Sequence, residues 1–279
     1  MRPLKLSTWI GHNEVTMAVD GSRFEGKISI VTGASRGIGR GIAVRLAAAG
    51  SSVVLCARDQ TLLDAAAAEI RGAGGTAEIV ALDLRVPDSA QRIANFAIER
   101  FGKIDILVNN AGATKRGEFL DLTDEDFADG FELKFFGSVR LTRAAWPYLK
   151  AAGGSVIFVS GVGGRTPGAQ FAIGGSVNAA LLSLTKALAD LGLRDGVQVN
   201  AINPGTIRTA RYTARLNTLA KEGGIDLESA EREYLRKGAI ARIGEPEDIA
   251  ALVAFIASRD GRMLHGALID MDAGATKTI

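Results

Sequence analysis

Cysteine and histidine are scarce in this chain, and long apolar runs are missing. The 279 residues include one cysteine, Cys56, so no disulfide can form within the chain. Cys56 follows the apolar residues Val53, Val54 and Leu55, and we expect it to be a small buried hydrophobic residue rather than a nucleophile. No group of His, Cys, Asp or Glu has metal-ligand spacing, so no metal site is predicted. No apolar run approaches the roughly 20 residues that a membrane helix needs.

The net charge is also small. A formal charge of +2 provides no general electrostatic attraction to nucleic acid, and neither nucleic acid nor a membrane is expected as a partner. Residues 1–24 have no signal-peptide pattern and no clear period, and we interpret them as an N-terminal tail or arm before a single domain at 25–279. With one free cysteine and no signal, the sequence favours the cytoplasm.

From residue 25 onward, short β-branched runs alternate with longer segments of helical periodicity. Strands are expected at 27–32, 52–57, 77–82, 104–108, 155–160, 197–202 and 267–271, and helices at 38–49, 62–71, 89–101, 124–150, 173–193 and 247–257. Strands separated by helix-length segments imply a parallel sheet covered on both faces, which is an α/β, doubly wound fold of about seven strands. Between 206 and 242 the alternation stops, and this polar, basic segment is predicted to be a helical lid over a substrate site.

The first predicted strand leads into a glycine-rich turn, because residues 32–39 read Thr-Gly-Ala-Ser-Arg-Gly-Ile-Gly. Glycines let backbone N–H groups approach a pyrophosphate, and the helix that follows points its positive end toward it. The spacing Thr-Gly-x-x-x-Gly-x-Gly resembles that of the short-chain dehydrogenase/reductase family. Asn-Asn-Ala-Gly at 109–112, the Pro-Gly segment at 203–209 and Arg-Ile-Gly-Glu-Pro-Glu-Asp-Ile-Ala at 242–250 are similar to family segments and come in the same order.

This resemblance covers the chain from about Phe24 to its C-terminus. It implies a Rossmann-type sheet, a dinucleotide cofactor and a small-molecule substrate. It also implies a homotetramer in which the helices at 124–150 and from 173 onward pack against symmetry mates. The cofactor contacts that it implies are Gly33, Ser35, Arg36, Gly37, Ile38, Gly39, Arg58, Asp83, Leu84, Asn110, Ala111, Gly112, Pro204, Gly205, Ile207 and Thr209.

Two arginines bear on which dinucleotide is bound. NAD-preferring members usually have an acid at the end of the second strand, where it binds the ribose hydroxyls. Here Arg58 stands near that place, where it would face the 2′-phosphate of NADP, and Arg36 in the glycine-rich turn adds a second cation. NADP is therefore predicted, with NAD as the alternative. An ion pair of Arg58 with Asp59 and a solvated Arg36 are the competing interpretations.

The family's catalytic residues are replaced in this chain. Members use a Ser, a Tyr and a Lys, the last two as Tyr-x-x-x-Lys, together with an Asn on the long preceding helix. None of the three tyrosines is followed by lysine at this spacing. Alignment places Gly161, Gly174 and Asn178 at the Ser, Tyr and Lys positions, and Lys134 at the Asn position. The first turn of the helix from 173 thus has glycine where the proton donor would stand.

Family members have Asn on the long helix and Lys on the following one, whereas this chain has Lys134 and Asn178 at these two positions. The amide and the ammonium have thus changed places, which suggests a swap of the two groups rather than loss of the site. We predict that the Lys134 ammonium reaches Asn178 or the nicotinamide ribose, and that burial lowers its pKa enough for it to act as a weak general acid. Other candidates for a rebuilt site stay open. They are Ser160, Arg165 and Thr166 in the loop after the fifth strand, and Tyr212 and Tyr234 in the lid.

The lid also carries Arg208, Arg211 and Arg215 at positions i, i+3 and i+7, which share one face of a helix. If that face lines the pocket, it would favour an anionic substrate such as a carboxylate or a coenzyme A thioester; a solvated face is the alternative.

Two functions follow from the sequence. One is an NADP-dependent oxidoreductase acting on a carbonyl or alcohol through an atypical site, and the other is a dinucleotide-binding protein without turnover, acting as a sensor or subunit.

Overall fold

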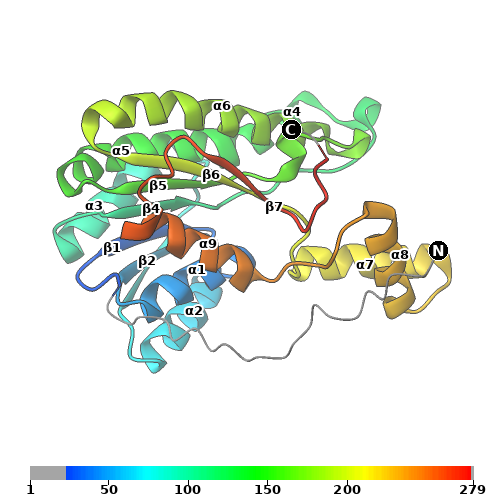
Figure 1. The fold of residues 1–279 in the computed structure, drawn as a ribbon, viewed down its shortest axis with the longest axis horizontal. Helices are drawn as coiled ribbons and strands as arrows, with labels where there is room; N and C mark the ends of the chain where they lie inside the picture. Colours follow the sequence, from blue (N-terminus) through cyan, green and yellow to red (C-terminus); the bar gives the residue numbers. More distant parts are fainter. Residues whose placement is uncertain (1–22, 278–279) are drawn as a thin grey trace, which may run out of the picture.

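The computed structural model of the protein describes residues 23–277 (Figure 1). The tail predicted at 1–24 lies outside the described residues, except for its last two positions. Phe24 is 2% exposed, and its N–H donates to the Ala49 carbonyl at 2.7 Å. The side chain of Phe24 therefore belongs to the core.

Within the described part of the chain, seven parallel strands form one sheet in the order β3-β2-β1-β4-β5-β6-β7. The strands are β1 (Ile28–Thr32), β2 (Ser52–Ala57), β3 (Ala77–Ala81), β4 (Ile106–Asn109), β5 (Ser155–Val159), β6 (Gln198–Pro204) and β7 (Leu268–Met271). Every residue of β1 and β5 is buried, as expected for strands that helices cover on both sides. The predicted parallel sheet is confirmed.

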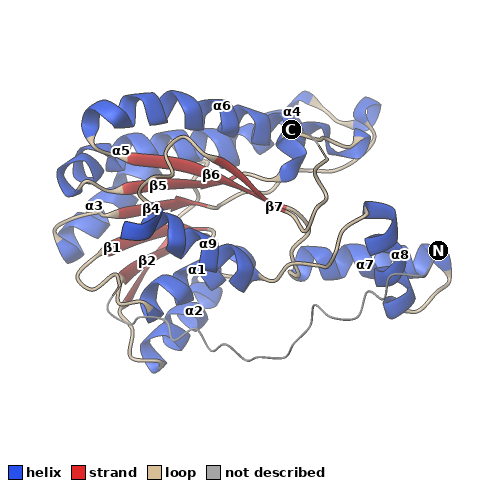
Figure 2. Ribbon diagram, in the orientation of Figure 1, coloured by secondary structure: helices blue, strands red, loops and turns tan. Residues whose placement is uncertain are grey.

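Helices cover both faces of this sheet (Figures 1 and 2). One face carries α1 (Gly37–Ala48), α2 (Gln60–Gly72) and α9 (Pro246–Ala257), and the other carries α3 (Ser89–Phe101), α5 (Gly137–Ala152) and α6 (Ala172–Asp195). Successive side chains of a strand point to opposite faces, so Val31 packs in the first layer and Ile30 in the second. The doubly wound α/β class predicted from the sequence is thus confirmed.

The segment Ala169–Asp195 is long and apolar enough to cross a membrane, which corrects the expectation that no such run exists. In this fold α6 packs beside β6, and buried residues recur along it from Ile173 to Gly192. Its apolar character is accounted for by this packing, as in the core helix of a globular domain.

The stretch predicted as one helix at 124–150 is interrupted. After α4 (Asp124–Phe131) comes a π-helical turn, Glu132–Phe136, and then α5. The periodicity of apolar residues does not distinguish a single π-helical turn from a turn of α-helix, so the sequence did not reveal this interruption. Such insertions are frequent at functional sites, and this one carries Lys134.

The segment predicted as a helical lid contains two helices, α7 (Ala210–Gly223) and α8 (Leu227–Gly238). They extend beyond the end of the sheet (Figure 1). They pack on each other around a small core of their own that includes Tyr212, Leu216 and Ala230. Asp226 caps α8 by accepting a hydrogen bond from the Ser229 N–H at 2.7 Å. The helical structure predicted for this segment is confirmed.

Candidate functional site

The strand order places a topological switch point between β1 and β4. The chain leaves β1 toward β2 on one side of the sheet and leaves β4 toward β5 on the other. In open parallel sheets, the crevice at the carboxyl ends of two such strands is where ligands bind. The glycine-rich turn at 33–39 and the segment 110–112 follow these two strands, so both lie at this crevice.

The glycines of the turn are required by its geometry. Gly33 and Gly37 have φ angles of +65° and +55°, which L side chains rarely adopt. A Cβ on Gly39 would lie 2.3 Å from the Gly33 carbonyl oxygen. Helix α1 begins at Gly37 with no capping side chain and no acidic residue in its first turn. Its free N–H groups and its dipole therefore favour an anion here.

Thr32 and Asn110 hold this turn against the segment after β4. The Thr32 hydroxyl accepts hydrogen bonds from the backbone N–H groups of Asn110 at 2.9 Å and Ala111 at 3.0 Å. The Asn110 amide donates to the Thr32 carbonyl at 2.9 Å. Asn110, which was expected to contact a cofactor, thus also supports the turn through its side-chain amide. Sequence reasoning missed Thr32, although it is the first residue of the Thr-Gly motif.

Arg58 and Arg36 stand at the edge of the same crevice. Asp59 caps α2 by accepting from the Leu62 N–H at 3.0 Å, so the alternative ion pair of Arg58 with Asp59 is wrong. Arg58 Nη1 instead lies 3.5 Å from Asp83 Oδ2, and 62% of its side chain remains exposed. Arg36 is also exposed, at the N-cap of α1. Both guanidinium groups are accessible to a ligand.

Two residues close in sequence to Arg58 and Asp83 are buried, namely Cys56 and Leu84. Burial, together with the negative charge of Asp83, raises the pKa of the Cys56 thiol to about 12, so Cys56 is protonated at neutral pH. The prediction that Cys56 is a small buried hydrophobic residue is confirmed. The Leu84 side chain is 5% exposed and packs in the layer between the sheet and α3. A ligand at this point would reach the backbone of Leu84 rather than its side chain.

The segment after β6 folds back onto the glycine-rich turn. Pro204 ends β6, Gly205 follows it, and Ile207 is 6% exposed. The Thr209 methyl group lies 3.2 Å from the position of a Cβ on Gly37. Of the other residues expected to bind a cofactor, Ser35 and Ile38 are half-buried within the turn itself. The tertiary structure thus brings the separate motifs together around one crevice.

Lys134 forms the centre of the second half of the site. Its Nζ donates to Asn178 Oδ1 at 2.6 Å and to the Ser160 carbonyl at 2.7 Å. Its stem passes Gly112, where a Cβ would lie 2.7 Å from Lys134 Cδ. The contact between Lys134 and Asn178 that the sequence predicted is therefore present.

The surroundings of Lys134 change its acidity. Burial lowers the pKa of the ammonium from 10.5 to about 7, and the positive charge of Arg211 contributes to the same shift. Arg211 Nη2 donates to the Gly112 carbonyl at 3.2 Å, which places this guanidinium beside the lysine stem. The third N–H of the ammonium has no acceptor among the described residues. A group with these properties can hold or release a proton near neutral pH.

Phe171 explains the glycines at the start of α6. A Cβ on Gly174 would lie 2.0 Å from Phe171 Cε2, and a Cβ on Gly163 would lie 2.7 Å from the same ring. The phenyl ring thus fills the volume into which a side chain at 174 would extend. Gly161 has a φ of +151°, and a Cβ there would lie 2.8 Å from Asn178 Nδ2. The sequence did not reveal the role of Phe171.

The other candidates for a catalytic role in the loop after β5 form hydrogen bonds or an ion pair with other protein groups. The Ser160 hydroxyl donates to the Asn178 carbonyl at 3.1 Å, so it supports α6. Arg165 forms an ion pair with Asp270 at 2.6 Å. Thr166 is exposed and donates to a backbone carbonyl one turn earlier at 3.3 Å. These contacts favour structural roles for all three side chains.

The lid tyrosines pack against each other, with ring centroids 5.9 Å apart in an edge-to-face arrangement. Burial and the negative charge of Glu231 raise the pKa of Tyr212 to about 12. The Tyr234 hydroxyl shares a hydrogen bond of 2.8 Å with Thr206. Arg208 pairs with two carboxylates, among them Glu231 at 2.8 Å, so its charge is already neutralised within the protein.

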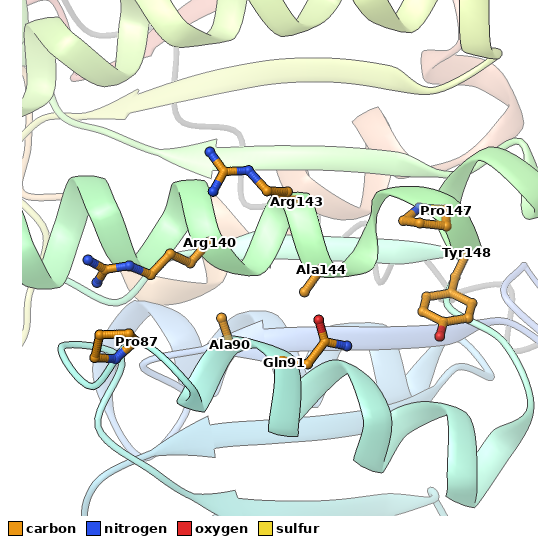
Figure 3. Close-up of a pocket in the computed structure, with 8 residues that line it drawn as sticks. All are labelled: Pro87, Ala90, Gln91, Arg140, Arg143, Ala144, Pro147 and Tyr148. Atoms are coloured by element: carbon orange, nitrogen blue, oxygen red, sulfur yellow. The ribbon is translucent and has the colours of Figure 1, made fainter.

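A surface hollow also lies between α3 and α5 (Figure 3). Its lining includes Arg140, Arg143 and Tyr148, but no residue of the glycine-rich turn or of the Lys134–Asn178 pair. Arg140 is already paired with Glu132. The arrangement of free N–H groups, glycines and an acidic ammonium therefore places the candidate site at the switch point and not in this hollow.

Comparison with known proteins shows the family of this chain. The family described as short chain dehydrogenase matches residues 27–219. An uncharacterised oxidoreductase of Mycobacterium tuberculosis is 38% identical over 262 residues, which cover 93% of this chain and 96% of that protein. The 7alpha-hydroxysteroid dehydrogenase of Bacteroides fragilis is 32% identical over 91% of this chain and 96% of its own length.

Solved structures extend the similarity to three dimensions. L-sorbose reductase from Gluconobacter frateurii, complexed with NADPH and L-sorbose, matches with a TM-score of 0.89 at 30% identity, over 93% of this chain and 100% of that one. A short chain dehydrogenase from Burkholderia cenocepacia J2315 in complex with NADP has a TM-score of 0.80 at 31% identity, over 91% and 99% of the two chains. This chain belongs to the short-chain dehydrogenase/reductase family.

Proposed function

We propose that the protein is an NADP-dependent oxidoreductase that interconverts a small carbonyl compound and its alcohol, with Lys134 and Asn178 in place of the family's usual proton-transfer residues. The observation that carries this proposal is the Lys134 ammonium, held 2.6 Å from Asn178 Oδ1 with a pKa lowered to about 7 by burial and by Arg211. A proton donor with such a pKa suits carbonyl reduction near neutral pH.

The residues at the switch point fit a dinucleotide. A Cβ on Gly33 would lie 2.9 Å from Asn110 Nδ2, so only glycine lets the turn pack this closely against the segment after β4. The uncapped N–H groups of α1 suit a pyrophosphate. Arg58 and Arg36, both exposed, suit the 2′-phosphate that distinguishes NADP from NAD.

When bound, the nicotinamide ring supplies the hydride for reduction of a carbonyl carbon. The third N–H of Lys134 polarises the carbonyl oxygen and then gives it the proton. Asn178 Oδ1 and the Ser160 carbonyl keep the other two N–H groups in place, which fixes the direction of the third. After proton transfer the amine is neutral, and the buried surroundings favour that form.

Consumption of NADPH in the presence of aldehydes, ketones, quinones and thioesters tests the proposal, together with calorimetric binding of NADPH. Turnover of any member of this panel is the expected result. Binding without turnover would instead favour a dinucleotide-binding protein that acts as a sensor or subunit. Absence of NADPH binding would overturn both functions.

Arg58→Ala should weaken NADPH binding by about 10- to 100-fold, because hydrogen bonds to a charged group contribute roughly 1.5–3 kcal/mol. NADH binding should stay nearly unchanged, since NADH lacks the 2′-phosphate. Calorimetric titration of both cofactors at one salt concentration measures the difference. Arg40→Ala, at another exposed arginine of the same region, serves as control. Equal affinities of the unchanged protein for NADPH and NADH would contradict the prediction.

We also propose a cytoplasmic homotetramer in which α5 and α6 pack against the same helices of other copies. Ala179, Ala180 and Ser183 on α6 are small and at least partly exposed, so they permit close approach of a second helix. Light scattering at micromolar concentration should show a mass of four chains. A stable monomer at this concentration would contradict the proposal.

A further inference from the structure

Three arginines gather around the crevice without a carboxylate within ion-pair distance in the part of the chain that the structure describes. Arg116 lies in the loop after β4, and Arg211 and Arg215 lie on the first two turns of α7. The Arg116 guanidinium sits 3.9 Å from the centre of the Phe171 ring. Arg211 donates to the Gly112 carbonyl at 3.2 Å. Aromatic and backbone groups thus position these side chains, but none of these groups neutralises a charge.

Arg215 is held in a similar way. Its guanidinium lies 5.0 Å from the centre of the Tyr234 ring, and its Nη1 donates to the Tyr234 hydroxyl at 3.3 Å. The positive charges of Arg215 and Arg211 both act on Arg116, whose pKa is lowered first by burial and then by these two neighbours. Positive charges that act on one another repel, so the arrangement favours a counter-ion.

Other arginines in and near the lid have carboxylate partners. The ion pairs are Arg208 with Glu231 and Glu245, Arg232 with Glu228, Arg236 with Glu233, and Arg242 with Asp248. Acidic side chains are therefore plentiful in this region. Arg116, Arg211 and Arg215 differ from these arginines: they come from two segments, the loop after β4 and α7, and none of them pairs with a carboxylate in the described part of the chain.

We infer that Arg116, Arg211 and Arg215 bind an anionic group of the substrate, a carboxylate or a phosphate, while the reacting carbonyl lies toward Lys134. This inference rests on the proposed function, because it assigns a second substrate contact in the same site. Gly112 links the two contacts, since its carbonyl accepts from Arg211 and its Cα faces the Lys134 stem. Guanidinium groups held by an aromatic ring or a hydroxyl keep further N–H donors for bidentate binding of an anion.

Two matched pairs of carbonyl compounds test the inference by calorimetry on the NADP-loaded protein. The first pair is 4-oxopentanoate and 4-oxopentanamide, and the second is dihydroxyacetone phosphate and dihydroxyacetone. We expect at least one anionic member to bind about 10-fold or more tightly than its neutral partner, since a charged hydrogen bond contributes roughly 1.5–3 kcal/mol. The pair that shows the preference distinguishes a carboxylate site from a phosphate site.

The ratio of the dissociation constants of the neutral and the anionic compound should fall close to one in each of three variants, Arg116→Gln, Arg211→Gln and Arg215→Gln. Arg232→Gln removes a lid arginine that already pairs with Glu228 and should leave the preference unchanged. Equal binding of charged and neutral members, binding by none of the four compounds, or the same loss in Arg232→Gln would overturn the inference.

The same titrations in Lys134→Met separate this inference from the proposed function. If the unchanged protein has no turnover but the anion preference persists in Lys134→Met, the arginine site stands and the proposed reaction fails. If neutral carbonyl compounds are reduced with no anion preference, the reaction stands and the arginine site fails. Should NADP not bind at all, titration of the free protein still measures the preference.

Discussion

Replacing Lys134 with methionine should lower kcat for carbonyl reduction by about 100- to 10,000-fold, the range that a positioned general acid contributes. Methionine keeps an unbranched apolar stem beside Gly112 but removes the ammonium that reaches Asn178 and Ser160. The adenosine half of the cofactor should still bind, because the glycine-rich turn and Arg58 are untouched. NADPH consumption and calorimetric NADPH binding, measured on the same sample, give the two readouts.

The pH dependence provides a second check on Lys134. Because the ammonium is the proton donor, reduction should decline as pH rises through about 7, the pKa of Lys134 in the folded protein. Any residual activity of Lys134→Met should lack this decline. A variant with the same pH profile as the unchanged protein would show that another group donates the proton.

The ionisation of Lys134 should also make the free energy of unfolding depend on pH. The pKa of Lys134 is about 7 in the folded protein and 10.5 as its ordinary value. Between these values the unfolded chain holds a proton that the folded protein has released, so stability rises with pH relative to Lys134→Met. Below about pH 7 both states are protonated, and the cost of the buried charge is present in full. Urea unfolding of the cofactor-free proteins at either end of this window measures the difference.

Lys150→Met is the matched control for Lys134→Met. Lys150 lies in the last turn of α5, where it is paired with Asp195 at 2.8 Å and largely exposed. Its replacement should leave kcat nearly unchanged. Full activity in Lys134→Met would contradict the assignment of Lys134, and equal losses in both variants would indicate a general effect on the helix.

Gly174→Tyr, which restores the residue expected at this position from the family resemblance, should destabilise the protein by about 3 kcal/mol, the upper part of the usual range for overpacking. Its Cβ would lie 2.0 Å from Phe171 Cε2, so the Phe171 ring must move. That ring is stacked against Arg116 at 3.9 Å and also abuts Gly163, so displacing it disrupts both contacts. Urea unfolding measures the loss of stability.

Removing the obstructing ring should reverse this effect. In the Gly174→Tyr background, Phe171→Ala should recover most of the lost stability, and a double-mutant cycle should give a coupling of at least about 1 kcal/mol. Ser176→Tyr adds the same side chain at an exposed position on the same turn of α6 and should change stability by less than about 0.5 kcal/mol. Gly174→Tyr as stable as the unchanged protein would mean that Phe171 does not limit this position.

Contacts between distant segments were the hardest to predict. Arg58 was expected to face the 2′-phosphate of NADP or, alternatively, to pair with Asp59, but Asp59 caps a helix and Arg58 approaches Asp83. Arg208 was grouped with Arg211 and Arg215 by helical spacing, yet carboxylates from α8 and the start of α9 neutralise it. Spacing along a helix shows which side chains share a face, but it does not show which acids another segment brings to that face.

By itself, the sequence determined the doubly wound sheet, the helical structure of the segment 206–242 and the place of the glycine-rich turn. These features depend on local rules: β-branched runs alternate with helical ones, and a backbone with positive φ requires glycine. The Lys134–Asn178 contact could also be predicted, because two residue types had exchanged positions within a known pattern. Only the tertiary structure decided the π-helical turn, the Phe171 ring against Gly174 and the contribution of Arg211 to the lowered pKa of Lys134. Each of these depends on burial and on charges from segments far apart in the chain, which no local pattern encodes.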